Sequence, residues 1–239
     1  KYCKVYVITE GEFREEIEAA LVSFPYRNNL VFYYNPVPER VRKMCWNQGD
    51  WRFYKYYRAW QLSTYLLAKS VIEEHKIDIL HQLNMIGFRE PGYLWKIPFL
   101  PLVWGPVDAK ERFPVSFLQK ASFVSKLKIH LKNTITYIQL KYHRRVHHMA
   151  ERASLLIGAS KESVISFEKF FGKSAILMNE TGCQEELILR THIPGSRKKI
   201  RLLWVGKFDF RKQLDLALEV LTQLPKDVFE RLRLRLMGW

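Results

Sequence analysis

The stretch Ile200-Arg-Leu-Leu-Trp-Val-Gly206-Lys-Phe-Asp-Phe-Arg-Lys-Gln213 decides how this chain is interpreted. Its apolar first half predicts a strand over residues 200–205 that ends at Gly206. Apolar residues at helical spacing after the loop predict a helix over residues 212–223. A strand, a glycine turn and a helix start form an anion site in open α/β sheets, because helix N–H groups and the helix dipole attract phosphate.

The loop within this stretch carries three basic residues, Lys207, Arg211 and Lys212. Two lysines five positions apart can reach a diphosphate from both sides. A solvated basic loop is the alternative interpretation. The position between a strand-ending glycine and a helix start favours phosphate binding.

Composition places the 239 residues among globular proteins and predicts anionic partners. Hydrophobic residues make up 48% of the chain, and 39 basic against 24 acidic residues give a net charge of +15. Such a charge indicates phosphorylated ligands, acidic lipid surfaces or nucleic acid. Three cysteines without a C-x-x-C pair predict a reducing compartment, and with no apparent signal peptide we expect a cytoplasmic protein.

Strand and helix patterns alternate along almost the whole chain. We expect strands over residues 3–9, 29–35, 77–83, 99–104, 154–159, 175–179, 200–205 and 232–237. We expect helices over 12–23, 51–75, 116–152 in several pieces, 161–171 and 212–223, with Ser160 capping the start of helix 161–171 and Gly172 ending it. This order predicts an α/β fold with Rossmann-like parallel sheets and helices on both faces. A polar connection over 184–199 predicts a boundary between a domain of residues 1–190 and the beginning of a second over 196–239.

Several motifs in this order resemble GT-B fold glycosyltransferases of family 4 (glycosyl transferases group 1). Besides the opening stretch they are Asp78-Ile-Leu-His-Gln82, Gly87-Phe-Arg-Glu-Pro-Gly92 and Trp104-Gly-Pro106. The resemblance covers most of the acceptor domain and the start of the donor domain, so it implies a truncated GT-B arrangement that is inactive by itself. The chain departs from the family where Asp108-Ala109 follows the Gly-Pro, at Lys207, where arginine is commoner, and at Gln213, where glycine is usual.

The resemblance implies a function. The enzyme would move a hexosyl unit from a nucleotide diphosphate sugar to a carbohydrate, lipid-linked or small-molecule acceptor, with retention of configuration and without metal or cofactor. Gly206, Lys207 and Lys212 would hold the donor diphosphate, with Arg211 peripheral. The family's paired glutamates would lie beyond Trp239.

Five residues are candidates for the acceptor side of the cleft: His81, Trp104, Gly105, Pro106 and Glu180. Each lies at or near the end of a predicted parallel strand, where such folds bind ligands. Each also has a structural interpretation. His81 can be a hydrogen-bonded core residue, Trp104-Gly-Pro106 a rigid turn with a packed indole, and Glu180 the close of a turn.

The helical region 120–152 carries eight Lys or Arg residues and a single acid, Glu151. Apolar residues recur at helical spacing beside Lys126, Lys128, Lys132 and Lys141, which are candidates for contact with an anionic membrane surface on the inner face of the membrane. A core-packed helix with a solvated basic side is the alternative. Nucleic acid is not expected, because stacking aromatics are few. His143, His147 and His148 fit a surface helix better than a metal site.

Two other classes of function stay open. One is a sugar-nucleotide-binding module without catalysis. The other is a non-catalytic basic module that binds an anionic membrane surface or nucleic acid, and it predicts salt-sensitive binding without any need for a nucleotide sugar.

Overall fold

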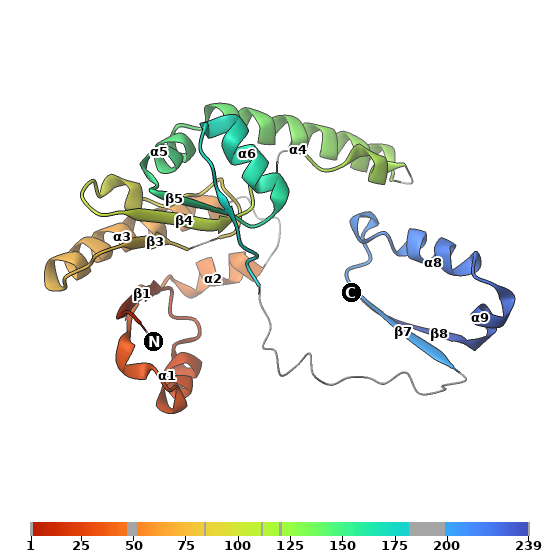
Figure 1. The fold of residues 1–239 in the computed structure, drawn as a ribbon, viewed down its shortest axis with the longest axis horizontal. Coiled ribbons are helices and arrows are strands. Elements are labelled where there is room, and N and C mark those ends of the chain that lie inside the picture. The colour runs from red at the N-terminus through yellow and green to blue at the C-terminus, as the bar shows by residue number, and fades with distance from the viewer. Residues whose placement is uncertain are drawn as a thin grey trace. The chain divides into compact units, whose positions relative to one another are not determined.

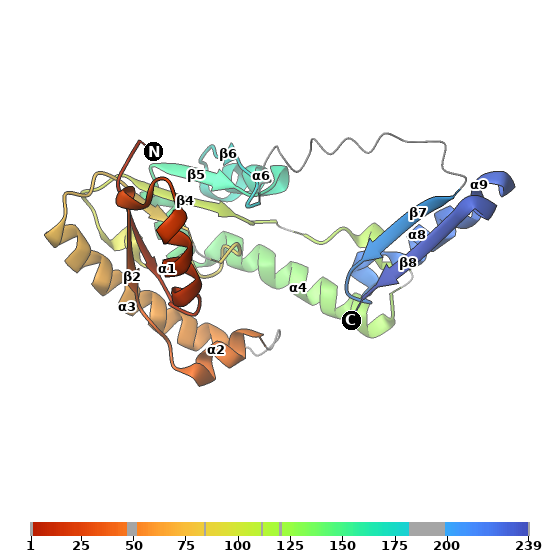
Figure 2. The same cartoon turned by 90° about the horizontal axis from the view of Figure 1, so that it is seen from below.

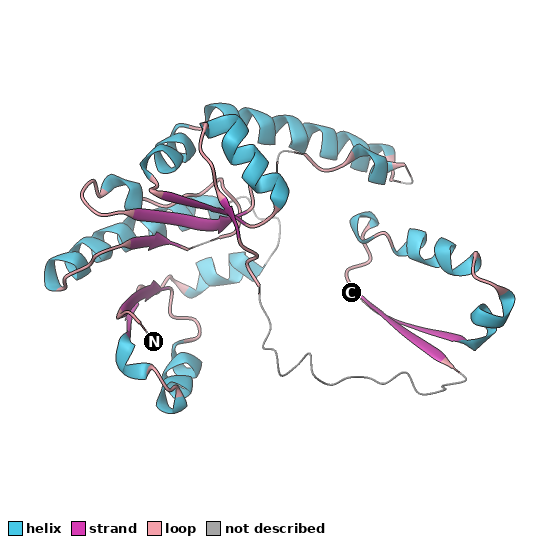
Figure 3. Cartoon of the chain, in the orientation of Figure 1, coloured by secondary structure: helices cyan, strands magenta, loops and turns pink. Residues whose placement is uncertain are grey.

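The computed structural model describes residues 2–46, 52–83, 85–110, 112–119, 121–181 and 199–238. Helices and strands alternate in it, and the paired strands run parallel, so the α/β prediction is confirmed (Figures 1 and 3). The strands are β1 Val5–Thr9, β2 Leu30–Tyr34, β3 Leu80–Gln82, β4 Leu102–Val107, β5 Leu155–Gly158, β6 Ile176–Leu177, β7 Ile200–Val205 and β8 Leu232–Met237. The helices are α1 Arg14–Ser23, α2 Glu39–Trp46, α3 Phe53–Glu74, α4 Phe123–Tyr142, α5 Arg144–Arg152, α6 Lys161–Phe171, α8 Leu214–Thr222 and α9 Lys226–Arg231.

The chain divides into two compact units, each discontinuous in sequence. The first unit comprises Lys1–Lys110 and Ile138–Glu180, and the second comprises Glu111–Tyr137 and Thr181–Trp239. The predicted linker over 184–199 falls almost wholly outside the described residues, so the domain boundary there stays a prediction. The structure adds that 111–137, which the sequence analysis placed in the first domain, groups with the C-terminal part.

Strands β1 and β2 form a two-stranded parallel sheet with a helix on each face. Tyr33 and Tyr34 are adjacent in β2, so their side chains point to opposite faces. The Tyr34 hydroxyl donates to Glu18 of α1, at 2.8 Å. The Tyr33 hydroxyl is bonded to His75, directly after α3, at 2.8 Å. Helices α1 and α3 therefore cover the two faces of this pair.

The main core lies on one face of the four-stranded sheet β3-β4-β5-β6. Leu80 is in register with Leu102 and Gln82 with Trp104, so these side chains share that face. Helix α6 packs there through Phe167, whose ring lies 5.7 Å from that of Trp104. Helices α3 and α5 pack against the same core through partly or fully buried residues, among them Tyr65, Ile72, Val146, Met149 and Ala150.

Two local predictions hold in detail at α6. The Ser160 hydroxyl accepts a hydrogen bond from the Ser163 N–H at the start of the helix, and Gly172 ends it with φ 63°. Strand β4 differs from its prediction, because it continues through Gly105 and Pro106 to Val107 instead of ending at Trp104. Gly105 is required for this course, since its φ is 129° and a side chain would collide with the Ile157 carbonyl.

Strands β7 and β8 pair in parallel over their full predicted lengths, 200–205 and 232–237. Helix α8 begins two residues later than expected, because Phe210–Lys212 forms a 3₁₀ turn first. Helices α2 and α9 were not predicted; each is short, with eight and six residues, and begins directly after a proline. No helix within the described ranges has the length and apolarity needed to cross a membrane.

Candidate functional site: a basic turn after β7

Two glycines lie at the carboxyl ends of the paired strands β7 and β8. The Gly206 N–H donates to the Met237 carbonyl at 3.0 Å, which places the ends of both strands at the same edge. A Cβ at Gly238 would lie 2.6 Å from the Gly206 carbonyl oxygen and 2.7 Å from the Phe208 ring. Position 238 therefore needs a residue without a side chain, whereas a Cβ at Gly206 would meet only the Trp204 ring, at 3.2 Å. Parallel α/β sheets bind ligands at this edge.

The turn that follows is shaped by Asp209. Its carboxylate accepts the Arg211 backbone N–H at 2.9 Å and three bonds from the Arg211 guanidinium, the shortest at 2.7 Å. These bonds, the side-chain bond first among them, lower the pKa of Asp209 to about 2. Arg211 is thereby paired within the loop, and its charge is neutralised by its neighbour.

Lys207 and Lys212 lie on either side of this Asp209–Arg211 pair. In the described part of the chain the structure records no hydrogen bond and no ion pair for either ammonium group. The Lys207 charge contributes weakly to the low pKa of Asp209. Two flexible cations therefore flank the turn, with α8 beginning directly after it.

Gln213 joins the turn to α8 in a left-handed conformation, with φ 51°. Its side-chain amide donates to the Phe210 carbonyl at 2.6 Å, and its own N–H donates to the same carbonyl at 3.2 Å. A left-handed backbone favours glycine, which is the residue that family 4 usually has here. This chain adopts that conformation with a glutamine.

Of the acceptor-side candidates, His81 and Gly105 lie together in the first unit. His81 is exposed, and its Nε2 lies 2.7 Å from the Gly105 carbonyl oxygen across neighbouring strands. Its side chain alternates with the buried Leu80 and Gln82, so it lies on the less covered face of the sheet, and Ile79 and Leu83, two residues away on either side, are 60% and 64% exposed. Of the five candidates, His81 is the one with a polar side chain open to solvent on a strand, the edge strand β3 of the four-stranded sheet.

The other acceptor-side candidates are placed less favourably. Trp104 is only 1% exposed and packs against Phe167, so its indole is a core group without surface for an acceptor. Pro106 continues β4, where the structure gives it a place in the strand. Glu180 is exposed and lies three residues after β6. The packed-indole interpretation of Trp104 thus describes the structure.

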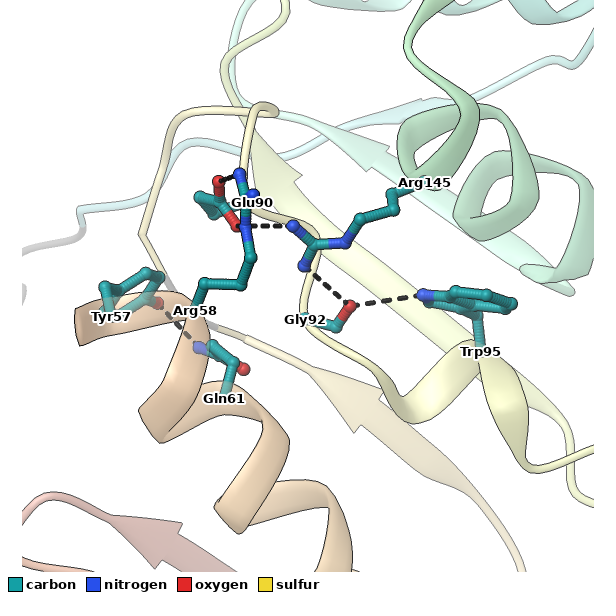
Figure 4. A network of polar contacts seen from close by, with 7 residues as sticks. All are labelled: Tyr57, Arg58, Gln61, Glu90, Gly92, Trp95 and Arg145. Atoms are coloured by element: carbon teal, nitrogen blue, oxygen red, sulfur yellow. Dashed lines mark hydrogen bonds and ion pairs between the residues drawn. The ribbon is translucent and has the colours of Figure 1, made fainter. Parts of the chain in front are cut away.

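A buried ionic network occupies the loop between β3 and β4 (Figure 4). Glu90 and Gly92 belong to the quoted motif 87–92, but no role was predicted for them or for their partners. Glu90, 4% exposed, accepts from Arg58 of α3 at 2.6 Å and from Arg145 of α5 at 2.7 Å. Arg145 and the Trp95 indole also donate to the Gly92 carbonyl, at 3.4 and 3.1 Å. The network ties α3, α5 and the motif 87–92 together, which gives that motif a structural role.

The sequence offered a weak signal for this network. Glu90 is an acid between Arg89 and Pro91 in a loop flanked by glycines, but its two partners lie 32 and 55 residues away. Arg89 itself bonds to Gln139 at 2.7 Å, and burial lowers its pKa. Only folding brings these groups together.

The three histidines of α5 and its start take packing roles. His147 bonds to the Leu140 carbonyl at 3.0 Å, and the His148 ring stacks on Trp95 at 5.2 Å. Burial lowers the pKa of His143. Within the described residues, no group of three or more His, Cys, Asp or Glu side chains is placed to hold a metal ion.

Comparison with models of known protein families, with curated proteins and with solved structures finds no match to this chain.

Proposed function

We propose that this chain belongs to a glycosyltransferase that takes its sugar from a nucleotide diphosphate donor, and that the turn 206–213 binds the donor diphosphate. The observation that carries the proposal is the pair Lys207 and Lys212. They flank a glycine-ended strand and the start of α8, while Asp209 holds the third cation, Arg211, within the loop. The left-handed Gln213 supports it further, since the family pattern has glycine at that position.

The charges of the turn favour an anion. Lys207, Arg211 and Lys212 oppose Asp209 and Asp215, so the segment keeps a net charge of about +1. Asp209 is engaged with Arg211, and Asp215 lies in the first turn of α8, where an acid is favoured by the helix dipole. The two lysines are the charges left to meet a ligand.

The proposed chemistry is the transfer of a hexosyl unit. The bond between the anomeric carbon and the β-phosphate oxygen breaks, a new bond forms to the acceptor oxygen, and the acceptor loses its proton. Negative charge grows on the leaving diphosphate. Ammonium groups and backbone N–H groups fixed beside it stabilise that charge most in the transition state. The acceptor, the retention of configuration and the independence from metal are proposed on the family resemblance.

Equilibrium binding of a nucleoside diphosphate tests the site in this chain directly. We expect UDP, GDP or ADP to bind, and Lys212→Ala to weaken binding by about 10- to 100-fold, the loss typical of one charge-assisted contact. Isothermal titration calorimetry gives the affinity. Lys226→Ala is the matched control, because it removes the same charge from an exposed helix of the same unit and leaves the turn intact.

The rate of sugar transfer is the second readout, and it is measured on a protein in which this turn is part of a whole donor domain. There Lys212→Ala is expected to lower turnover about 30- to 1000-fold, as for other positioned groups that stabilise a developing oxyanion. Lys207→Ala should also lower turnover, and Arg211→Ala should lower it less. Turnover and diphosphate affinity both within about twofold of the parent in Lys212→Ala would remove the phosphate role and the proposal with it.

A further inference from the structure

Helix α4 has two apolar faces, and only one of them is buried. Its buried side carries Ile129, Thr136 and Leu140, which are 9%, 5% and 0% exposed. Asn133 lies on the same side, where it exchanges hydrogen bonds with the backbone of Phe113. These four residues recur at helical spacing and account for the packing of α4.

The opposite side of α4 is an exposed apolar stripe. Its members are at least 43% exposed: Val124 (58%), Leu127 (60%), Leu131 (59%), Ile135 (43%), Ile138 (49%) and Tyr142 (63%). At about 100° per residue they fall within a sector of about 80°, roughly opposite Ile129 and Leu140. Phe123, 80% exposed, stands beside the stripe at the start of the helix. Figure 2 shows α4 as one uninterrupted helix, so the stripe is continuous over about five turns.

Three lysines border this stripe. Lys128 and Lys132 lie on one side of it, about 55° and 95° away around the helix, and Lys141 lies about 85° away on the other. All three residues are exposed. Lys126 lies about 145° from the stripe, next to the buried face, and is half-buried. The structure therefore divides the four predicted lysines into three that flank the apolar stripe and one that does not.

We propose that α4 binds the surface of an anionic lipid bilayer, with the stripe inserted among the acyl chains and Lys128, Lys132 and Lys141 at the headgroups. The proposal is independent of the donor site. An apolar sector bordered by cations on both sides is the pattern of a helix that lies in a membrane interface. Lysine stems reach from the sides of such a helix to the phosphates while their methylenes cover apolar surface.

Charge complementarity selects this occupant over a protein partner. From Phe123 to Tyr142 α4 carries four lysines and no acid, within a chain of net charge +15. Tyr142, at the end of the stripe, has the amphipathic ring favoured at headgroup level, and Lys141 lies over that ring at 5.1 Å. An open depression lies where α4 meets α5, and it can receive a phosphate group. It is lined by Lys141, Tyr142, Arg144, His147, His148 and Glu151.

Co-sedimentation with vesicles tests the proposal on the whole chain. We expect the parent to pellet with vesicles of phosphatidylcholine containing 30% phosphatidylglycerol, and not with phosphatidylcholine alone. Changing Lys128, Lys132 and Lys141 together to glutamine should weaken binding about 100-fold, near fivefold for each charge at the surface. Lys126→Gln should have a smaller effect than any of the three, because it lies across a helix about as wide as the Debye length.

Two further variants separate insertion from general charge. Leu127→Ser with Leu131→Ser keeps every lysine and should weaken binding at least tenfold, since the apolar stripe is interrupted. A control that changes Lys55, Lys69, Lys161 and Lys226 to glutamine removes four exposed charges elsewhere and should bind nearly as the parent does. Circular dichroism confirms that each variant is folded.

Three outcomes would overturn the proposal. In the first, the parent does not pellet with anionic vesicles at low salt. In the second, the triple-lysine variant binds vesicles as the parent does. In the third, the four-lysine control loses as much vesicle affinity as the triple variant. A parent that is dimeric without lipid, and monomeric when Leu127 and Leu131 are serine, would identify a second copy of this chain as the occupant and reject the membrane.

Discussion

The sheet β3–β6 and the pair β7–β8 are built from the same parallel strand pattern, yet apolar strand residues are buried in the first and exposed in the second. In the first, Leu102 and Trp104 of β4 are at most 1% exposed. In the second, Leu203 and Val205 of β7 are both 60% exposed. Between residues 199 and 238, Gly206 is the one buried residue that the structure describes.

A strand pattern therefore specifies which strands pair, whereas the burial of their apolar side chains requires a layer of helices packed on the sheet. Sheet β3–β6 has three helices, α3, α5 and α6, packed over one face. Pair β7–β8 spans only two strands, so it presents little area for helices to cover. Stability is therefore concentrated in the first unit, and the basic turn of the second unit sits on a scaffold with few buried contacts.

The largest expected effect is the loss of a core ring. Phe167→Ala removes the aromatic side chain that packs on Trp104 and Phe171, and should lower the free energy of unfolding of the first unit by about 3–5 kcal/mol. Hydrogen exchange of peptides from β4, β5 and α6 under increasing urea measures it locally. Leu203→Ala is the contrasting change, expected within about 1 kcal/mol, because most of that side chain is already in water. Equal losses would erase the distinction between the two regions.

The next effect concerns the buried charge of the first unit. Glu90→Gln leaves the Arg58 and Arg145 guanidinium groups without their carboxylate, and should destabilise this unit by about 3 kcal/mol. Glu10→Gln is the matched control, since the Glu10–Arg42 pair is similar in length at 2.8 Å but more exposed. Its expected cost is below about 1 kcal/mol. Urea denaturation measures the free energy of unfolding of both variants. A larger loss of stability for Glu10→Gln than for Glu90→Gln would contradict the expectation that the buried ion pair matters more.

A smaller effect is expected at the left-handed residue of the second unit. Gln213→Gly should keep the turn, whereas Gln213→Val should destabilise it by about 1–2 kcal/mol relative to glycine, because a β-branched side chain collides with the backbone at positive φ. Hydrogen exchange of the segment 206–217 reports the difference. If valine protects that segment as well as glycine does, then the turn is not held in this conformation.

The smallest effect is the pH dependence of the turn. The Asp209 carboxyl has its pKa lowered from 3.8 to about 2 by Arg211, so its pairing stabilises the folded turn fully above pH 3.8. That contribution is lost as the pH falls through 2, and it should stay below about 1 kcal/mol for a pair so near the surface. A carbon-13 NMR titration of the Asp209 carboxyl should show a midpoint near 2 that returns toward 3.8 in Arg211→Ala. An unchanged midpoint in that variant would assign the shift to another group.

Much of the local structure was predictable because it depends on neighbours in sequence. Strands 200–205 and 232–237 were placed correctly, and so was helix 161–171 with its Ser160 and Gly172 caps. A glycine and two lysines within seven residues also predicted an anion site at the turn 206–213, and that role stays a prediction. The sequence did not reveal that Asp209 would engage Arg211, since Lys207 and Lys212 in the same loop could also have paired with it.

The sequence by itself determined the periodicity of the strands and helices, the caps and the excess of positive charge. These follow from backbone sterics, hydrogen bonding and composition within a few residues. The tertiary structure alone decided that Trp104 is a core residue, that Glu90 meets Arg58 and Arg145, and that the stripe on α4 is exposed while its other apolar side is buried. Both sides of α4 have helical spacing, so periodicity cannot rank them. Which of the two is buried depends on the elements that pack against the helix, and these are distant in sequence.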